Sequence, residues 1–486
     1  MSDDKLKILF LSAEAVPFAK VGGLADVAAA LPKALRALGH DVRLMLPRYG
    51  SMRSDDFKFE KVGRPFSVPV GPEQESVHLV RTTADGDVPV YLVWDEKFFS
   101  PREKIYGFDD DPQRFAFFGR AVTASLPTME WMPDVVHAND WHTAVVPTWL
   151  NYEGQYLAEY ADLASLFTIH NLAYQGISGR LILTFSQMEY VKHLDVEPAG
   201  QVNWMAQGIA HADLVSTVSP QYAQDILKPE VGGDLAPLLN RRKDRLSGIL
   251  NGIDYDLWNP ATDTGIPQRF SLTNLNMRAV NKAALQREAR LPDRADAPLV
   301  GMVGRLDYVK GADLLEPFLE QLLQNDVQFV LLGTGQPEYH ETLEELRSRF
   351  PDKMRPFLKY DEALARRIYA GCDIFLVPSR FEPCGLVQMI AMRYGAVPTV
   401  HRTGGLADTV TDYHQWPDNA NGFVFDDFTP EACIDAVKRA IQVYHDPDAW
   451  TTLQTRGMKA DFSWEASAKK YVKMYRRAHD LHQQNR

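Results

Sequence analysis

The sequence predicts an α/β protein of two Rossmann-like, doubly wound domains, and three observations lead to this fold class. Short apolar runs alternate with helical patterns along most of the chain. Many of these runs end in polar or glycine-rich loops, as parallel strands do at the edge of a sheet that binds ligands. The alternation starts afresh past the middle of the chain, and 486 residues are more than one domain usually holds.

The first half of the chain opens with a βαβ pattern. Residues 7–12 form an apolar run, residues 23–38 carry apolar side chains at helical spacing, and residues 41–46 are apolar again. Residues 57–93 alternate and contain proline and glycine, which suggests short strands or hairpins. A helix is expected over residues 115–126. Further strands of the same sheet are expected at residues 134–137, 166–170 and 214–218.

The second half repeats this organisation. The expected elements are strands at 299–303 and 327–332 around a helix at 312–323, then strands at 374–377 and 396–400 around a helix at 385–394. Turn chemistry near residues 251–260 marks the change of domain. We therefore predict an N-terminal domain over 1–258 and a C-terminal domain over 259–462. The amphipathic end, 463–486, is expected to form a helix that packs back on the first domain.

Composition excludes several classes of function. The formal net charge of −12 argues against a broad basic surface for nucleic acid or anionic membranes. No apolar run approaches the roughly 18 residues of a membrane span. Three cysteines, an odd number, suit a reducing compartment. We expect a cytoplasmic protein with no nucleic-acid or membrane partner.

Two glycine pairs stand between an expected strand and an expected helix. They are Gly22–Gly23, close to Lys20, and Gly404–Gly405, after Thr403. Backbone N–H groups at such a turn and at the following helix N-terminus can bind an anion such as a phosphate. For Gly22–Gly23, an ordinary tight turn is the alternative, because this stretch is neither a Walker nor a GxGxxG motif.

Charged side chains occur in loops at the same expected sheet edge. Arg305 and Lys310 flank one loop, where two cations could neutralise a phosphate leaving group. Glu382 lies in a loop after the 374–377 strand, where a carboxylate could hold sugar hydroxyls or stabilise positive charge at an anomeric carbon.

Two acidic or histidine-rich stretches could be mistaken for metal sites. His137, Asp140 and His142 lie in one stretch, and Asp109–Asp111 is a DxD triplet. A conformationally free loop holds tetrahedral zinc geometry poorly. The DxD triplet precedes a helical pattern, which favours helix capping. We expect no metal site.

Five longer motifs resemble the family of bacterial glycogen synthases and plant starch synthases, over nearly the whole chain. They are FAKVGGLADV, HNLAYQG, GRLDYVKG, SRFEPCGLVQ and RTGGL. The resemblance implies a GT-B fold, with two domains facing each other across a deep cleft. It also implies a retaining transfer of glucose from ADP-glucose to the non-reducing end of an α-1,4-glucan such as glycogen. Neither a metal nor a cofactor takes part in the family's reaction.

The resemblance also implies roles for individual residues. Glu382 and His170 would hold the glucose, Arg305 and Lys310 would stabilise the diphosphate, and Asp140 would lie toward the acceptor. The substrate-binding candidates are Lys20, Gly22, Gly23, Asn171, Asn251, Tyr360, Cys384, Gly385, Leu386, Thr403, Gly404 and Gly405. Among them, the ring of Tyr360 is expected to stack on the nucleotide base.

One position departs from the wider superfamily, and three alternatives stay open. Related two-domain transferases carry a glutamate for the ribose where this chain has Ile390, so the ribose contacts are undefined. The alternatives are a synthase that uses UDP-glucose, a glucan phosphorylase with pyridoxal phosphate on a lysine, and a non-catalytic glucan-binding protein.

Overall fold

The structure is a computed structural model that describes residues 5–53, 55–190 and 200–485. It divides into two compact units. Unit 1 comprises Met1–Gly252 and Trp464–Arg486, and unit 2 comprises Ile253–Ser463. The chain therefore enters unit 2 slightly before the predicted boundary and returns to unit 1 for its last helix.

Unit 1 is built on a nine-stranded sheet within the described residues, in the order β11-β10-β7-β6-β1-β2-β5-β4-β3. The strands from β11 to β5 are parallel, and β4 and β3 extend the sheet as an antiparallel edge. The strands are β1 (Lys7–Leu11), β2 (Asp41–Pro47), β3 (Glu60–Val70), β4 (Glu73–Ala84), β5 (Val88–Trp94), β6 (Val135–Asn139), β7 (Ala164–Ile169), β10 (Leu214–Thr217) and β11 (Leu246–Gly248). A separate pair joins β8 (Ile177–Gly179) to β9 (Gln201–Asn203).

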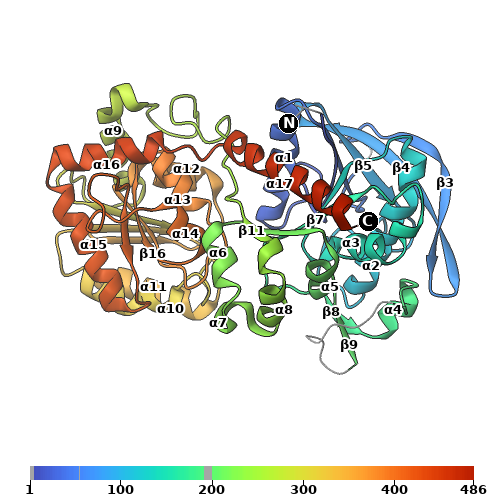
Figure 1. Cartoon of the computed structure of the whole chain (residues 1–486). Helices are drawn as coiled ribbons and strands as arrows, with labels where there is room; N and C mark the ends of the chain where they lie inside the picture. Colours follow the sequence, from blue (N-terminus) through green and yellow to red (C-terminus); the bar gives the residue numbers. More distant parts are fainter. Residues whose placement is uncertain (1–4, 54, 191–199, 486) are drawn as a thin grey trace. The chain divides into compact units, whose positions relative to one another are not determined.

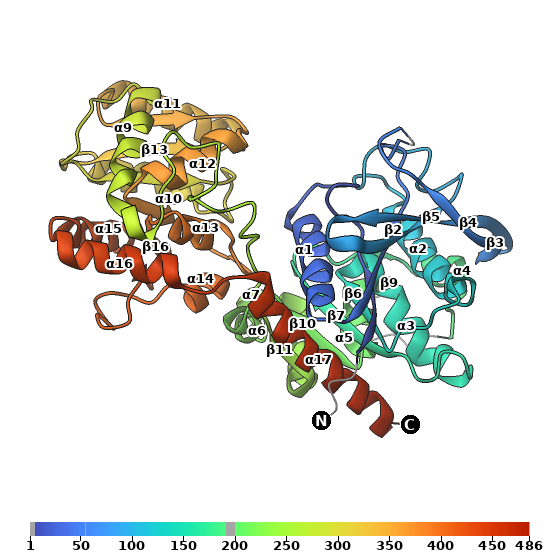
Figure 2. The ribbon, with the colours of Figure 1, turned by 90° about the horizontal axis from the view of Figure 1, so that it is seen from above.

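Helices cover both faces of this sheet (Figure 2). One face carries α1 (Gly23–Ala37) and α17 (Trp464–Asn485), and the other carries α2 (Asp111–Ser125) and α3 (Val145–Tyr152). The remaining α-helices are α4 (Leu181–Phe185), α5 (Trp204–His211), α6 (Pro220–Asp225), α7 (Pro229–Gly232) and α8 (Ala236–Arg241). Helix α1 forms because Leu24, Val27, Leu31 and Leu35 make one buried stripe.

Unit 2 is a six-stranded, wholly parallel sheet in the order β14-β13-β12-β15-β16-β17. Its strands are β12 (Leu299–Val303), β13 (Gln328–Leu332), β14 (Met354–Phe357), β15 (Ile374–Val377), β16 (Val397–His401) and β17 (Phe423–Phe425). Strand β15 is buried along its whole length, as expected of a central parallel strand with helices on both faces.

The helices of unit 2 form two layers, which Figure 1 shows above and below its sheet. The upper layer contains α9 (Arg278–Glu288), α12 (Glu362–Gly371), α13 (Val387–Arg393) and α16 (Pro447–Lys459). The lower layer contains α10 (Ala312–Leu322), α11 (Pro337–Arg349) and α15 (Pro430–Tyr444). The short helix α14 (Gly404–Thr409) follows β16.

Several elements were not predicted. Helix α11 buries only Leu343 and Leu346 among its described side chains, so its apolar stripe is too thin to stand out. Helices α9, α15 and α16 and strands β11, β14 and β17 were also missed. In the part of the chain that the structure describes, no helix combines the length and apolar character that a membrane crossing requires.

Helix α17 is joined to the sheet of unit 1 by a buried chain of hydrogen bonds. The Tyr475 hydroxyl lies 2.8 Å from His137 Nδ1, and His137 Nε2 lies 2.6 Å from Thr168 Oγ1. Ser216 Oγ lies 2.5 Å from the same Thr168 oxygen. The network therefore ties the last helix to β6, β7 and β10, close to the loops that carry the predicted residues Asp140 and His170.

Candidate active site

In unit 2, Lys310 and Glu382 meet at the carboxyl ends of two adjacent strands. Lys310 follows β12 and Glu382 follows β15, and the Lys310 ammonium donates directly to Glu382 Oε2. Ser379 Oγ donates to the same oxygen at 3.1 Å. The Glu382 side chain is buried, with 9% of its surface exposed, whereas Lys310 is 26% exposed. A cation and a carboxylate predicted from separate motifs thus form one polar cluster.

The Gly404–Gly405 pair packs against the loop that carries Glu382. A Cβ atom on Gly404 would lie 2.0 Å from Glu382 O, and one on Gly405 would lie 2.0 Å from Cys384 O. The Gly405 N–H donates to the carbonyls of Glu382 and Pro383, each at 3.2 Å. The glycines are therefore required by close backbone approach. The predicted phosphate contact of the Gly405 amide stays a prediction, since this amide has protein acceptors here.

The turn after Glu382 is held by Gln388, on α13. Its amide Nε2 donates to Gly385 O at 2.8 Å, to Cys384 O at 3.2 Å and to Thr409 Oγ1 at 3.1 Å. Gly385 has a φ of +71°, which favours glycine. Ile390 is buried and offers no polar group for a ribose. The remaining candidates on these loops, Leu386 and Thr403, are half-buried.

Two other predicted residues of unit 2 remain open to solvent. The side chain of Arg305 is 66% exposed, and its nearest carboxylate is Asp307, at 3.4 Å. Tyr360 is 83% exposed. Asp361 accepts the Leu364 N–H at 2.9 Å and caps α12, so the local helix start explains Asp361 but gives Tyr360 no structural role.

In unit 1, the loop around Gly22 and Gly23 already holds an anion, which is the carboxylate of Glu14. Glu14 Oε2 accepts the N–H of Val21 at 2.5 Å and that of Gly22 at 3.0 Å. Burial raises the pKa of Glu14. Lys20 pairs with Asp26 at 2.7 Å on the surface. Sequence reasoning missed Glu14, although its position directly after β1 was a usable signal.

Asp140 and His170 lie together at the ends of β6 and β7. Asp140 Oδ1 accepts the backbone N–H of His170 at 2.8 Å. Asp140 also has a φ of +55°, which is a strained conformation for a residue other than glycine. Asn171 follows His170 and is half-buried. Three of the predicted residues of unit 1, Asp140, His170 and Asn171, therefore lie at one sheet edge.

The hydrogen bonds of Asn139 determine which ring nitrogen of His170 carries the proton. Asn139 Nδ2 donates to Leu11 O at 2.9 Å, which leaves Asn139 Oδ1 to face His170 Nε2 at 2.8 Å. His170 Nε2 must then be the donor. Burial lowers the pKa of His170 to about 3, so the ring is neutral near pH 7 and its Nδ1 is an acceptor.

We expect Asp140→Asn to stabilise the protein in a pH-dependent way. Burial raises the pKa of Asp140 from 3.8 to about 7. Between pH 3.8 and about 7, the folded state therefore keeps a proton on Asp140 that the unfolded state loses. The free energy of unfolding falls as the pH rises through this range, because the carboxylate must be charged while it is buried. Asp140→Asn should raise the unfolding temperature by about 5 °C at pH 8, and by less at pH 5. An equal change at both pH values, measured by differential scanning calorimetry, would contradict this shift.

The stretches that resemble metal sites have other partners. His137 belongs to the buried network with Tyr475, and His142 packs on Tyr106, with 4.9 Å between ring centroids. Asp110 pairs with Arg102, and Asp111 pairs with Arg114. Among the described residues, no group of three or more histidine, cysteine, aspartate or glutamate side chains could hold a metal ion.

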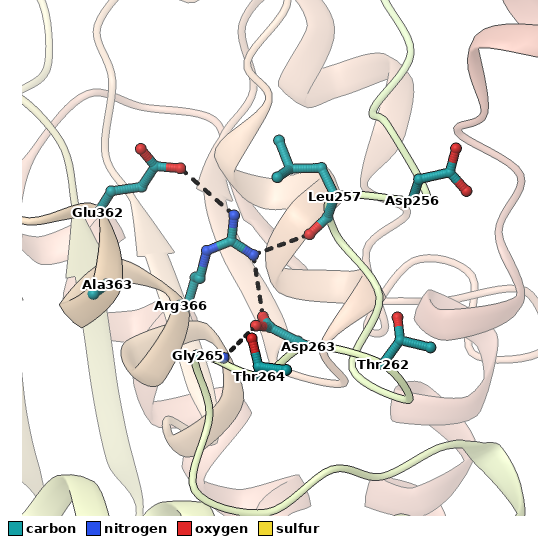
Figure 3. Close-up of a pocket in the computed structure, with 9 residues that line it drawn as sticks. All are labelled: Asp256, Leu257, Thr262, Asp263, Thr264, Gly265, Glu362, Ala363 and Arg366. Atoms are coloured by element: carbon teal, nitrogen blue, oxygen red, sulfur yellow. Dashed lines mark hydrogen bonds and ion pairs between the residues drawn. The ribbon is translucent and has the colours of Figure 1, made fainter.

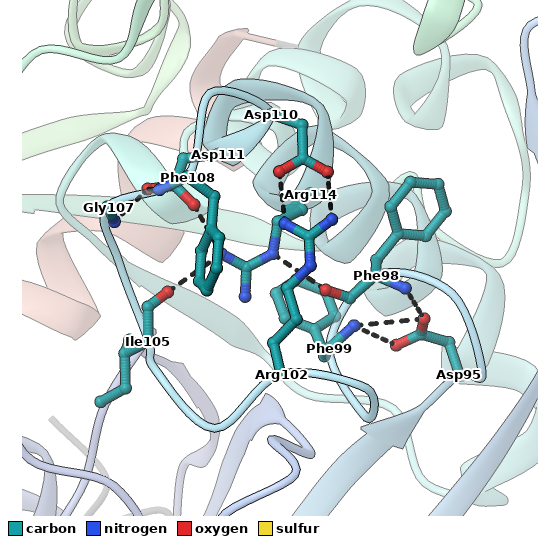
Figure 4. Close-up of polar contacts among 10 residues, drawn as sticks. All are labelled: Asp95, Phe98, Phe99, Arg102, Ile105, Gly107, Phe108, Asp110, Asp111 and Arg114. Carbon is teal, nitrogen blue, oxygen red and sulfur yellow. Dashed lines mark hydrogen bonds and ion pairs between the residues drawn. The ribbon is translucent and has the colours of Figure 1, made fainter.

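Arg114 orders the loop that leads into α2 (Figure 4). It is fully buried, and its guanidinium donates to Phe98 O at 2.9 Å and to Ile105 O at 3.1 Å. Tyr106 follows Ile105, and its pKa is raised well above the usual value by burial and by the nearby charges of Glu14 and Asp140. Tyr106 also packs on His142, two residues after Asp140, so it lies beside the Asp140 loop, and it was missed from the sequence.

A cavity of about 520 Å³ in unit 2 contains none of the predicted residues. Its lining includes Asp263, Glu362 and Arg366 (Figure 3). Arg366 is already engaged, because it donates to Leu257 O at 2.9 Å and to Asp263 Oδ2 at 3.2 Å. Asn251, in unit 1, is buried, and its Oδ1 has no hydrogen-bond partner among the described residues.

Comparison with known proteins gives the family. Residues 7–241 match the starch synthase catalytic domain, and residues 286–452 match the glycosyl transferases group 1 model. A glycogen synthase from Moorella thermoacetica is 47% identical over 476 residues, which cover 97% of each chain. The chain belongs to the glycogen synthase family. Another member, from Geotalea uraniireducens, is 44% identical over 97% of this chain and 99% of the relative.

Solved structures agree with this membership. The catalytic domain of starch synthase IV from Arabidopsis thaliana, bound to ADP and acarbose, has a TM-score of 0.89 and 36% identity. The match covers 98% of this chain and 100% of that one. Sucrose-phosphate synthase from Thermosynechococcus elongatus, at 20% identity and a TM-score of 0.59, shares the fold alone. The predicted GT-B fold and a glucosyltransferase of glycogen or starch synthesis are thereby confirmed.

Proposed function

We propose that this glycogen synthase family member transfers glucose from ADP-glucose to the 4-hydroxyl at the non-reducing end of an α-1,4-glucan, with retention at the anomeric carbon. The observation that carries the proposal is the contact between Lys310 and Glu382. It brings a cation suited to a diphosphate next to a carboxylate suited to a sugar, at the sheet edge where α/β proteins bind ligands. The ADP and acarbose in the structure of starch synthase IV support the same pair of substrates.

The reaction needs one bond to break and one to form on the same face of the sugar. The bond from the anomeric carbon to the diphosphate oxygen breaks, and the electron pair leaves with the diphosphate. The acceptor's 4-oxygen forms the new bond, and its proton passes to the departing phosphate oxygen. Lys310 and Arg305 balance the charge that develops on the diphosphate. Glu382 stabilises the positive charge at the anomeric carbon.

Unit 1 supplies groups that bind sugar hydroxyls in this proposal. His170 is neutral and keeps Nδ1 as an acceptor, so it takes a hydrogen bond from a hydroxyl of the transferred glucose. Asp140 and Asn171 take the acceptor side, and Lys20 adds a cation for the donor. Tyr360 of unit 2 offers an exposed ring to the nucleotide base.

We expect metal chelation to leave the rate unchanged. Lys310 and Arg305 supply the positive charge that a divalent cation provides in other nucleotide-sugar enzymes. Treatment with excess EDTA should therefore change kcat by less than about twofold, because no step depends on a metal. A loss of activity that Mg²⁺ or Mn²⁺ restores would contradict the proposal that the reaction needs no cofactor.

A donor competition tests the proposed function. Purified protein is mixed with glycogen and either ADP-glucose or UDP-glucose, and nucleotide diphosphate release is followed. Faster release from ADP-glucose is expected, whereas a preference for UDP-glucose would correct the donor. Binding of glycogen without any release would instead indicate a non-catalytic glucan-binding protein, and absorbance of pyridoxal phosphate would indicate a phosphorylase. We place the reaction in the cytoplasm, where free cysteines such as the three of this chain stay reduced.

A further inference from the structure

We propose that Arg380 is a positioning residue, which holds the loop of Lys310 and the loop of Glu382 in register. The inference rests on the roles proposed above for these two residues and goes beyond them, because Arg380 itself belongs to none of the predicted sets. It acts through the protein and not on the substrate. Its effect is to keep the lysine ammonium at the carboxylate.

The guanidinium of Arg380 lies between two aromatic rings. Its central carbon is 4.0 Å from the centroid of the Tyr308 ring and 3.9 Å from that of the Phe428 ring. Arg380 Nη2 also pairs with Asp313 Oδ2, in the first turn of α10, at 2.6 Å. A planar cation can stack on both rings and still make this ion pair, whereas a lysine ammonium is a point charge that cannot stack in the same way.

The stack joins the two loops close to the residues that act on the substrate. Tyr308 lies in the loop that carries Lys310, and Arg380 lies in the loop that carries Glu382. The Arg380 N–H donates to Val309 O at 2.9 Å, so the backbones of the two loops are also joined. Phe428 lies on a third segment, between β17 and α15, and supplies the second ring that contacts Arg380.

The backbones of these two loops are packed closely against each other. Gly311 has a φ of +76°, and a Cβ atom there would lie 2.1 Å from Pro378 O. The loops can approach this closely only because that side chain is absent. On the Glu382 side, His401 Nδ1 lies 2.9 Å from Ser379 O. Arg380 therefore joins two loops whose backbones are already in close contact. We expect the loss of its stacking to shift these loops, and Lys310 and Glu382 with them.

A double-mutant cycle tests the coupling. Arg380→Lys keeps the charge for Asp313 but removes the stacking, and it should lower kcat about tenfold with little change in KM for ADP-glucose, because the Lys310–Glu382 geometry matters most in the transition state. In a Lys310→Ala background, the same substitution should lower kcat by less than about twofold, because the group that it positions is gone. A purely structural role would give equal effects in both backgrounds.

Two further variants distinguish the proposed positioning role from a loss of folding. Phe428→Leu removes one face of the stack and leaves Arg380 intact, so it should reproduce part of the fall in kcat. Arg439→Lys is the matched control, since Arg439 pairs with buried Asp412 at 3.1 Å in the same unit, and its other partners, Asp435 and Val424, lie on neither loop. It should alter the unfolding temperature but not kcat. Circular dichroism gives the folded fraction of each variant.

The outcomes separate this inference from the proposed function. If Lys310→Ala strongly lowers turnover while Arg380→Lys and Phe428→Leu leave kcat unchanged, the inference is wrong and the function stands. Additive effects of Arg380→Lys and Lys310→Ala overturn it as well. If Lys310→Ala leaves turnover intact, the proposed role of Lys310 fails and the inference fails with it. Non-additive effects with an unchanged KM support it.

Discussion

Replacing Glu382 by glutamine is expected to lower kcat about 100-fold or more, since electrostatic groups of this kind contribute several kcal/mol to the transition state. Glutamine keeps the shape of the side chain and can still accept from Ser379. The substitution removes the negative charge of the carboxylate. That charge pairs with Lys310 and stabilises the positive charge that develops at the anomeric carbon. The KM for ADP-glucose should change less than about threefold, because the lost interaction belongs to the transition state. Initial rates of ADP release measure both constants.

Glu288→Gln is the matched control for this variant. Glu288 is also a cation-paired glutamate of unit 2, with Arg367 at 2.7 and 2.8 Å, but it pairs α9 with α12 and lies on neither catalytic loop. Its substitution should leave kcat unchanged. Equal turnover of Glu382→Gln and the wild type would show that the carboxylate takes no part in the reaction.

Gly405→Ala is expected to lower the unfolding temperature strongly and to abolish most activity. The new Cβ would lie 2.0 Å from Cys384 O and 2.6 Å from the Cys384 carbonyl carbon and Cα. Since all three atoms are backbone, relief requires the loop after Glu382 to move, at a cost of about 3 kcal/mol or more. Thermal unfolding followed by circular dichroism measures the change.

The glycine pair of unit 1 provides the contrast. A Cβ atom on Gly23 would meet nothing within 4 Å. Gly23 opens helix α1, where alanine is at least as stable as glycine, so Gly23→Ala should leave the unfolding temperature unchanged or raise it slightly. Two glycines that look equivalent in sequence should thus differ in stability. If both substitutions destabilise to the same extent, the close packing at Gly405 is not what requires glycine.

The positions of Lys310 and Glu382 were predictable because each follows an apolar run that could only be a buried strand. Parallel strands bring their carboxyl ends to one edge, so the two loops were expected at the same edge of the sheet. Their direct contact was not predictable, because it depends on strand order. Strand β15 pairs with β12 although the strands are far apart in the chain, and no local pattern encodes that pairing.

The glycine pairs are predicted to bind an anion, and this stays a prediction, since in the structure their amides donate to oxygens of the protein itself. Buried backbone amides pair with an acceptor, and here the acceptors are oxygens of the protein itself. Glu14 supplies that oxygen in unit 1, and the backbone of Glu382 and Pro383 supplies it in unit 2. The roles of Arg380 and Tyr106 were not predictable from the sequence, because their partners come from other segments of the chain. A stacked arginine has no sequence signal when both of its rings lie on other loops, as Tyr308 and Phe428 do.

The proposed glucosyl transfer is tested most directly by following labelled glucose from ADP-glucose into glycogen. We expect the label to enter the outer chains in α-1,4 linkage, so that β-amylase releases it as maltose, with one ADP formed for each glucose transferred. Glu382→Gln should reduce the label in proportion to its kcat. If no label enters glycogen from either ADP-glucose or UDP-glucose while the protein is folded, the proposed glucosyl transfer is contradicted.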